Sequence, residues 1–214
     1  PVVLFLMDAP GMREELRNMS RRIASAGYYV MASQLYYRDV DHYNLFETGD
    51  RDRMMELMSH LSNAMVADDA GAMITHAEAD PAADASRVGT VGYCMSGPFV
   101  CAAAAHFPER IAATASVYGA RLISDAPDSA HRTLGEIKGE IYFACAETDR
   151  WATPEQIAEL ERIMKAAGVR HRIEWYPGAE HGFAFPQRRG IYHKPSAERH
   201  WERLFALFDR TLRR

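Results

Sequence analysis

Short apolar runs alternate along this chain with amphipathic stretches, and this alternation limits the possible folds more than any other feature. The apolar runs are rich in β-branched residues, which is typical of buried strands. We expect strands at residues 2–7, 28–32, 88–93, 111–118, 141–146 and 169–176. We expect helices at residues 14–26, 53–59, 63–79, 97–105 and 155–167, and around the apolar stripe at 201–212.

Alternation of strand and helix predicts a mostly parallel α/β sheet with helices on both faces. No repeat, low-complexity tract or Pro/Gly linker divides the 214 residues, so we expect one domain over residues 1–214. Pro1 stands directly before the first apolar run. Since a domain rarely begins inside a core strand, we expect that this sequence lacks residues that precede Pro1.

Composition argues against several classes of function. The 25 basic and 29 acidic residues give a formal net charge of -4, so no broad basic field exists for nucleic acid or an anionic membrane. The apolar runs are shorter than the roughly 18 residues that span a bilayer, and no signal peptide is visible. Three cysteines do not suggest a disulfide framework, which favours a reducing, cytoplasmic location.

In a parallel sheet, ligands bind beside the carboxyl ends of the strands, so the residues after each strand matter most. After the third expected strand, Gly92, Cys94 and Ser96 fit the Gly-x-nucleophile-x-small pattern of a nucleophile elbow. A helix N-terminus there would favour the thiolate. Ser96 is a weaker nucleophile candidate because Cys94 and Pro98 flank it. The alternative is that Cys94 is a small buried residue at a tight turn.

Two later strand ends carry groups that could activate Cys94. Glu147 and Asp149 follow the fifth expected strand, and either could orient a histidine or simply solvate its loop. His181 lies in a glycine-bracketed loop after the last strand, where a general base would be needed. The chain order of nucleophile, acid and histidine is that of α/β-hydrolases.

The first strand end supplies a candidate oxyanion donor. With a nucleophile elbow, one donor is a backbone N–H after the first strand and the other is the N–H that follows the nucleophile. These positions are Ala9 and Met95, because Pro10 has no N–H.

With these residues assembled, the chain resembles the dienelactone hydrolase family of the α/β-hydrolase fold. Residues 92–97 resemble that family's cysteine elbow, residues 147–149 its acid loop and residues 176–183 its histidine loop. Residues 35–38 resemble the loop after the second strand, and the closing helix has the family spacing at Tyr192, Ala197, Trp201 and Phe205. The likeness extends from Val2 to about Leu212.

The resemblance implies a Cys94–His181–Asp149 triad that opens esters or lactones through a thioester. It also implies an α/β-hydrolase fold from which this sequence lacks an upstream β-hairpin. The family's acidic residue after the first strand modulates thiol ionisation, and here that residue is Asp8, one methylene shorter than the expected glutamate. Phe185 stands near the position of a family arginine that binds the substrate carboxylate.

Candidate substrate-binding residues follow the strand ends and are aromatic or cationic: Tyr36, Arg38, Arg51, Trp151, Phe183 and Phe185. Further arginines that could meet an anionic substrate group, or simply lie on the surface, are Arg53, Arg150, Arg188 and Arg189. We expect packing roles for the helical methionines Met54, Met55, Met58 and Met65, and core positions for Cys101 and Cys145. The histidines and cysteines lack metal-ligand spacing, so we expect neither a metal nor a cofactor.

Two functions stand as hypotheses. The first is a cysteine-dependent hydrolase of small-molecule esters or lactones that works as a monomer or small homo-oligomer. The alternative is a non-catalytic or thiol-sensing member of the same fold, favoured by the shorter Asp8 and by Phe185. A serine esterase is disfavoured because the chain contains no Gly-x-Ser-x-Gly.

Overall fold

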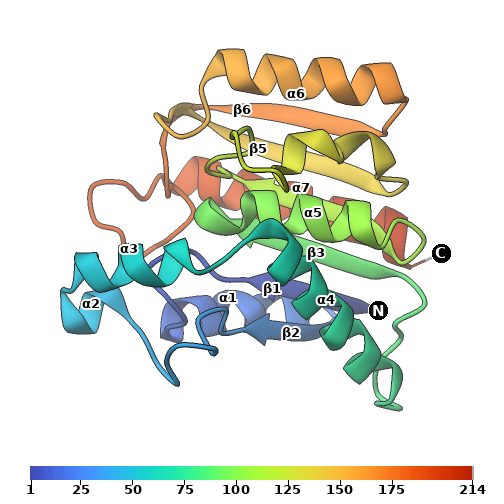
Figure 1. Ribbon diagram of the computed structural model, residues 1–214, viewed down its shortest axis with the longest axis horizontal. Helices are drawn as coiled ribbons and strands as arrows, with labels where there is room; N and C mark the ends of the chain where they lie inside the picture. The colour runs from blue at the N-terminus through green and yellow to red at the C-terminus, as the bar shows by residue number, and fades with distance from the viewer. Residues whose placement is uncertain (214) are drawn as a thin grey trace.

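A computed structural model describes residues 1–213, and its centre is a single six-stranded sheet in which every strand is parallel to its neighbours (Figure 1). The strands are β1 (Val2–Leu6), β2 (Tyr29–Ser33), β3 (Val88–Tyr93), β4 (Ile111–Val117), β5 (Glu140–Thr148) and β6 (His171–Glu180). Their order across the sheet is β2-β1-β3-β4-β5-β6. Val2 of β1 pairs with Tyr29 on one side and with Val88 on the other. The predicted parallel sheet is confirmed.

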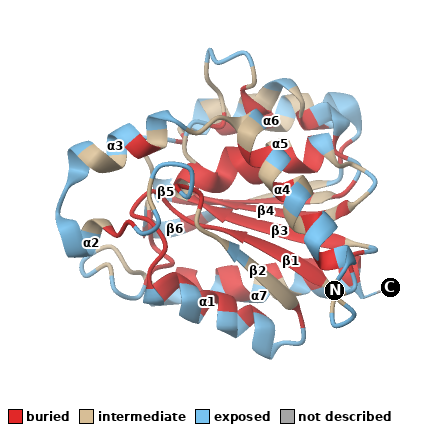
Figure 2. Ribbon diagram, turned by 60° about the horizontal axis from the view of Figure 1, so that its bottom comes forward, coloured by how far each residue is buried: buried red, intermediate tan, exposed pale blue. Residues whose placement is uncertain are grey.

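Helices cover both faces of the sheet (Figure 2). One face carries α1 (Glu14–Ser25) and α7 (Lys194–Leu212), and the other carries α4 (Asn63–Glu78), α5 (Gly97–His106) and α6 (Pro154–Ala167). Two shorter helices, α2 (Leu45–Thr48) and α3 (Arg51–Ser59), lie beyond the carboxyl ends of the strands (Figure 1). Within residues 1–213, no helix has both the length and the apolar composition of a membrane span.

The core has two layers because alternate residues of a strand point to opposite faces of the sheet. Val3 and Phe5 belong to the layer that contains Phe208 of α7. Val2 and Leu4 belong to the other layer, under α4, α5 and α6. All of β1 is therefore buried, which explains why its sequence is a continuous apolar run rather than an alternating one.

The last strand is longer than the sequence predicts. Instead of ending at Tyr176, β6 continues to Glu180, with an irregularity in its register against β5. Pro177 and Gly178 are typical of a loop, but Gly178 adopts a φ of 72° and lets the strand bend while it stays paired. His181 therefore follows the strand directly and not after several loop residues.

Two helical segments also differ from expectation. The closing helix α7 begins at Lys194, well before Trp201, because Pro195 is tolerated in a first helical turn. The short helix α2 was not predicted. It forms where the side chain of Asn44 accepts a hydrogen bond from the N–H of Phe46 at 3.1 Å, which caps the first turn.

Candidate active site

Cys94 stands at a sharp turn between β3 and α5. It begins a short 3₁₀ segment, Cys94–Ser96, with a φ of 54°, a left-handed conformation that is uncommon for a residue other than glycine. A Cβ at Gly92 would lie 2.3 Å from the carbonyl oxygen of Ser96, and a Cβ at Gly97 would lie 2.3 Å from the Cα of Gly119. The small residues around Cys94 are therefore a steric requirement of this turn.

The other hydroxyl and thiol groups near the elbow are closed off from solvent. Ser96 is fully buried, and its Oγ donates a hydrogen bond to the carbonyl oxygen of Met7 at 2.5 Å. Cys101 and Cys145 are buried, as predicted, and burial raises the pKa of Cys145 to about 12. Among the three cysteines, Cys94 is the partly exposed one.

Asp149 and His181, which follow the neighbouring strands β5 and β6, are in direct contact. The Nδ1 atom of His181 lies 2.8 Å from Oδ2 of Asp149, and the Asp149 side chain is only 1% exposed. The N–H of Trp151 donates to the other Asp149 oxygen at 2.8 Å. Glu147, the competing acid, instead accepts the N–H of Gly178 at 2.6 Å. The geometry thus separates two carboxylates that the residues alone left as alternatives.

The surroundings of His181 make it bind a proton tightly. Burial lowers its pKa, but the hydrogen bond to Asp149 and the neighbouring Cys94 sulfur raise it more, to about 9. The Nε2 atom is buried and has no well-aligned hydrogen bond to any group within residues 1–213. Cys94 nonetheless lies close enough to raise the pKa of the ring, first through a polar contact of its sulfur and then through charge. The ring also packs edge-on against Tyr118, with centroids 5.2 Å apart.

A cavity of about 960 Å³ opens beside Cys94 and His181 at the carboxyl ends of the strands. Its lining includes Ala9 and Met95, the residues whose N–H groups are the expected oxyanion donors. Its volume falls in the range of about 300–1,000 Å³ that is usual for small-molecule sites.

The methionines of α3 form part of the cavity wall. Met54 and Met58 also pack against the core as predicted, so the packing role holds for them but does not describe the whole function of this face. Met54, Met55 and Met58 line the cavity, whereas Met65 in α4 does not. The difference arises because α3 lies beyond the end of the sheet. Its apolar face therefore borders the cavity instead of packing entirely against strands. Met55 is 49% exposed.

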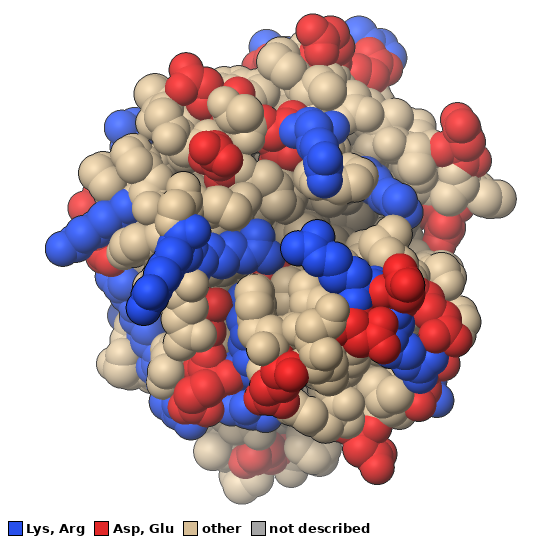
Figure 3. Space-filling view, turned by 90° about the vertical axis from the view of Figure 1, so that its left-hand side faces the viewer, with Lys and Arg blue, Asp and Glu red and all other residues tan. Residues whose placement is uncertain are grey.

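Cationic side chains surround the cavity. The arginines in its lining are Arg51, Arg121, Arg150, Arg188 and Arg189. Figure 3, which looks onto this end of the sheet, shows basic side chains arranged around a central hollow. Within residues 1–213, only Arg188 of this set takes part in an ion pair. Arg121 was not predicted, because it lies between β4 and β5 in a segment without a motif; its one signal is that it follows a strand end.

The structure divides the predicted substrate-binding residues into two groups. Arg51 and Trp151 line the cavity. Arg38 lies outside the lining and pairs with Asp69 at 2.6 Å. The remaining three are aromatic residues that have no exposed surface and lie outside the cavity lining, so they pack in the core: Tyr36, Phe183 and Phe185.

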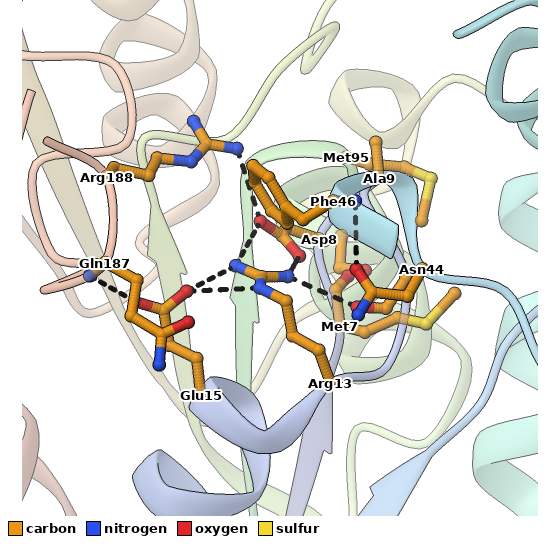
Figure 4. A network of polar contacts seen from close by, with 12 residues as sticks. Met7, Asp8, Ala9, Arg13, Glu15, Asn44, Phe46, Met95, Gln187 and Arg188 are labelled. Carbon is orange, nitrogen blue, oxygen red and sulfur yellow. Dashed lines mark hydrogen bonds and ion pairs between the residues drawn. The ribbon is translucent and has the colours of Figure 1, made fainter. Parts of the chain in front are cut away.

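Asp8 is buried in a network of charged groups next to the cavity (Figure 4). Arg13 contacts the Asp8 carboxylate at 2.5 and 3.2 Å, and it contacts Glu15 at 3.1 and 2.8 Å. Arg188 approaches Asp8 from the segment after β6, at 3.4 Å. Two arginines therefore engage the Asp8 carboxylate, and no hydrogen bond within residues 1–213 joins it to Cys94.

Comparison with known proteins identifies relatives along the whole chain. The model of the dienelactone hydrolase family matches residues 1–212. A proposed carboxymethylenebutenolidase of Synechocystis sp. is 29% identical over 220 residues, which cover 100% of this chain and 87% of that protein. Another, of Methylorubrum extorquens, is 28% identical over 208 residues, which cover 95% of this chain and 70% of that protein.

Solved structures share the architecture. The crystal structure of a proposed dienelactone hydrolase from Klebsiella pneumoniae matches with a TM-score of 0.87 at 25% identity, covering 97% of this chain and 86% of that one. A dienelactone hydrolase-like promiscuous phosphotriesterase from metagenomic libraries has the same fold, with a TM-score of 0.82 at 19% identity over 99% of this chain and 86% of that one. The chain belongs to the dienelactone hydrolase family, whose members are α/β-hydrolase-fold enzymes that act on ester and lactone bonds.

Proposed function

We propose that this protein hydrolyses small carboxylic esters or lactones through a Cys94–His181–Asp149 triad. The observation that supports this proposal most is that an acid, a histidine ring and a cysteine lie in a row at the carboxyl ends of the strands. Buried Asp149 bonds Nδ1 of His181, and the partly exposed Cys94 acts on the other side of the same ring. A nucleophile, a base and an orienting acid in that sequence of contacts is the arrangement of covalent acyl transfer.

In the proposed reaction, the proton of Cys94 already rests on Nε2 of His181, because the raised pKa of about 9 favours the imidazolium near neutral pH. Asp149 stabilises this imidazolium and holds its tautomer. The thiolate attacks the carbonyl carbon, and the π electrons move onto oxygen. When the C–O bond breaks, the leaving oxygen takes the proton from His181 and a thioester remains on Cys94. Water then gives a proton to His181 and attacks the thioester, which releases the carboxylic acid and returns the thiolate.

The negative charge on the carbonyl oxygen needs hydrogen-bond donors in place before the reaction begins. We assign this role to the backbone N–H groups of Ala9 and Met95, which line the cavity beside Cys94. Loss of one such donor typically costs about 3 kcal/mol of transition-state stabilisation.

The cavity wall favours a substrate with an apolar body and an anionic group. The α3 methionines offer an adaptable apolar surface. Four lining arginines form no ion pair within residues 1–213, and they outnumber the two lining carboxylates, Asp128 and Glu180. The cavity therefore has a positive field that would attract an anion. The names of the relatives point to the same chemistry, an unsaturated lactone with a carboxymethylene group. A thiolate nucleophile suits such enol lactones because their leaving groups are good.

Hydrolysis of 4-nitrophenyl acetate tests the proposal, since the released 4-nitrophenolate is measured directly. We expect Cys94→Ala to lower kcat at least about 10³-fold, since residues that act as one unit fail together, and His181→Ala to lower it nearly as much. Mass spectrometry should find the acetyl group on Cys94. The matched control is Cys101→Ala, the same change at a buried cysteine outside the cavity, which should retain activity.

Turnover by Cys94→Ala at the wild-type rate would refute the thiol mechanism. Alkylation of Cys94 by iodoacetamide in a protein that hydrolyses no ester would instead favour the thiol-sensing alternative.

A further inference from the structure

The turn that carries Ala9 is held by its carbonyl oxygens, although it belongs to no strand or helix. Each of the five successive carbonyl oxygens from Met7 to Gly11 accepts one hydrogen bond. The carbonyl of Met7 accepts from Ser96 Oγ at 2.5 Å, that of Asp8 from the N–H of Gly11 at 3.1 Å, and that of Ala9 from Tyr36 Oη at 2.9 Å. The carbonyl of Pro10 accepts from the N–H of Leu45 at 2.9 Å, and that of Gly11 from Arg13 Nη1 at 3.2 Å. The N–H of Ala9, by contrast, donates to no protein group within residues 1–213, and Ala9 lines the cavity. The turn therefore leaves one donor free beside Cys94.

Tyr36 is the side chain that reaches both proposed oxyanion residues. Its hydroxyl donates to the carbonyl oxygen of Ala9 at 2.9 Å and lies 3.5 Å from Sδ of Met95. A phenolic hydroxyl has one hydrogen, which the carbonyl oxygen takes as the stronger acceptor, so the sulfur contact is one of packing. Tyr36 has no exposed surface and is not in the cavity lining, so it acts without touching the substrate.

The hydrogen bond to Ala9 controls the direction of the neighbouring N–H. The Ala9 N–H lies in one rigid peptide plane with the carbonyl of Asp8, which is tied to Gly11. Tyr36 ties the next plane, between Ala9 and Pro10. With both planes held, the two backbone dihedrals of Ala9 are fixed and so is the direction of its N–H. An oxyanion donor is effective only when it is oriented before the charge develops.

Tyr36 keeps its proton while the site works. Burial, followed by the charges of Asp8 and Cys94, raises the pKa of Tyr36 far above its ordinary value. The hydroxyl therefore remains a donor to Ala9 even when Cys94 is a thiolate.

We propose that Tyr36 is a positioning residue of the oxyanion hole, whose hydroxyl holds the Ala9–Pro10 peptide so that the Ala9 N–H points at the developing oxyanion. This inference rests on the proposed Cys94 mechanism. Arg13 holds the far end of the same turn through Gly11, but it also bonds Asp8 and Glu15, as Figure 4 shows. Tyr36 therefore offers the cleaner test.

The test compares Tyr36→Phe with Tyr43→Phe. The two rings pack edge-on with centroids 5.9 Å apart, and the Tyr43 hydroxyl donates to the carbonyl oxygen of Asp50 at 2.6 Å, outside the turn. Both variants lose one hydroxyl that bonds a backbone carbonyl, so thermal melts should show similar stability losses. For each we measure kcat and KM with 4-nitrophenyl acetate, and the rate at which iodoacetamide alkylates Cys94. Alkylation occurs at a saturated carbon and forms no oxyanion.

We expect Tyr36→Phe to lower kcat and kcat/KM together by roughly tenfold, less than the 10²–10³-fold loss that follows complete removal of a donor. An equal loss in both constants marks an interaction made only in the transition state. Its alkylation rate should stay within about twofold of wild type, because the thiol and its base are untouched. Tyr43→Phe should match wild type in both reactions.

Three results would overturn the assignment of Tyr36: a wild-type kcat in Tyr36→Phe, an equal fall in its alkylation rate, or the same kcat loss in Tyr43→Phe. If Cys94→Ala is inactive in the same experiments, any of these results would refute the role of Tyr36 but leave the proposed hydrolase mechanism standing. Turnover that survives Cys94→Ala would defeat the proposed function, and the role of Tyr36 with it.

Discussion

Two carboxylates separated by a single residue have different partners at the end of β5. Glu147 accepts the N–H of Gly178 and so holds the bent extension of β6 against β5. Asp149 lies just past the end of the strand at Thr148, where its side chain is buried and bonds the ring of His181. One acid thus stabilises the strand that carries the histidine, while the other orients the histidine itself.

We expect Asp149→Asn to lower kcat by roughly 10²–10⁴-fold, because an amide neither stabilises the imidazolium nor holds its productive tautomer. The same change should bring the pKa of His181 down from about 9, since the Asp149 hydrogen bond is the strongest contact that raises it. An NMR titration of the ring measures that pKa. Glu147→Gln, the matched control, should change neither quantity, and a wild-type kcat in Asp149→Asn would contradict the proposed role.

The raised pKa of His181 also links its proton to stability. The folded protein holds this proton more tightly than the unfolded chain, in which the pKa is near the ordinary 6.5. The resulting stabilisation is complete below about pH 6.5 and is lost as the pH rises through about 9. Thermal unfolding across this range should show that loss in wild type and a smaller one in Asp149→Asn.

At the scale of elements, one cation joins the segments that surround the site. Arg13 stands at the start of α1 and bonds Asp8 after β1. Its guanidinium lies between the ring of Phe46 in α2, at 5.2 Å, and that of Phe185 after β6, at 5.0 Å. Glu15, the second carboxylate partner of Arg13, accepts a hydrogen bond from the backbone N–H of Gln187 at 2.7 Å. The packing of these segments therefore depends on a buried charge network.

We expect Arg13→Met to destabilise the fold by about 3–5 kcal/mol, because Asp8 and Glu15 would lose the cation that compensates their burial. Urea denaturation measures the change. The control is Arg17→Met on the same helix, where the side chain is exposed and lies 3.9 Å from Glu14; it should change stability by less than about 0.5 kcal/mol. Equal effects of the two variants would show that the buried network does not contribute to stability.

At the scale of the whole molecule, the parallel sheet gathers residues that are far apart in the chain. Asp149 and His181 follow adjacent strands, so the pairing of β5 with β6 brings them together. Cys94 follows β3, with β4 between it and β5, and the turn after β1 lies on its other side. The loops and helices that lie beyond these strand ends (Figure 1) supply the lining of the cavity, and Figure 3 shows the hollow at this end of the molecule.

The positive field of that cavity predicts a preference for anionic esters. Arg121→Met and Arg150→Met should each lower kcat/KM for a carboxylate-bearing ester by roughly two- to fivefold, the modest effect expected of partly solvated charges, and leave a neutral ester unchanged. Arg162→Met, on the exposed face of α6, should alter neither substrate. Equal losses on both esters would contradict recognition of an anion. High salt should weaken the preference.

The amino-acid sequence by itself determined the local features of this protein. The alternation of apolar runs and amphipathic stretches predicted all six strands and every α-helix except α2, and only the end of β6 and the start of α7 lie far from the predicted bounds. The spacing of Gly92, Cys94 and Ser96 predicted a tight turn at Cys94, and the close approach of Gly92 to the backbone of Ser96 explains it. These features were predictable because periodicity and steric crowding act between residues that are near one another in the chain.

Tertiary structure decided which side chains share the site. Residue type alone left Glu147 and Asp149 as alternatives, and the family resemblance favoured Asp149. The packing of β5 against β6 brings Asp149, and not Glu147, against the ring of His181. The position of α3 beyond the sheet turns its methionines toward the cavity. The pairing of Asp8 with Arg13, and the reach of Tyr36 to Ala9, likewise join segments that no sequence period connects. Such contacts depend on how whole elements pack in space, and a linear sequence pattern does not encode which distant segments become neighbours.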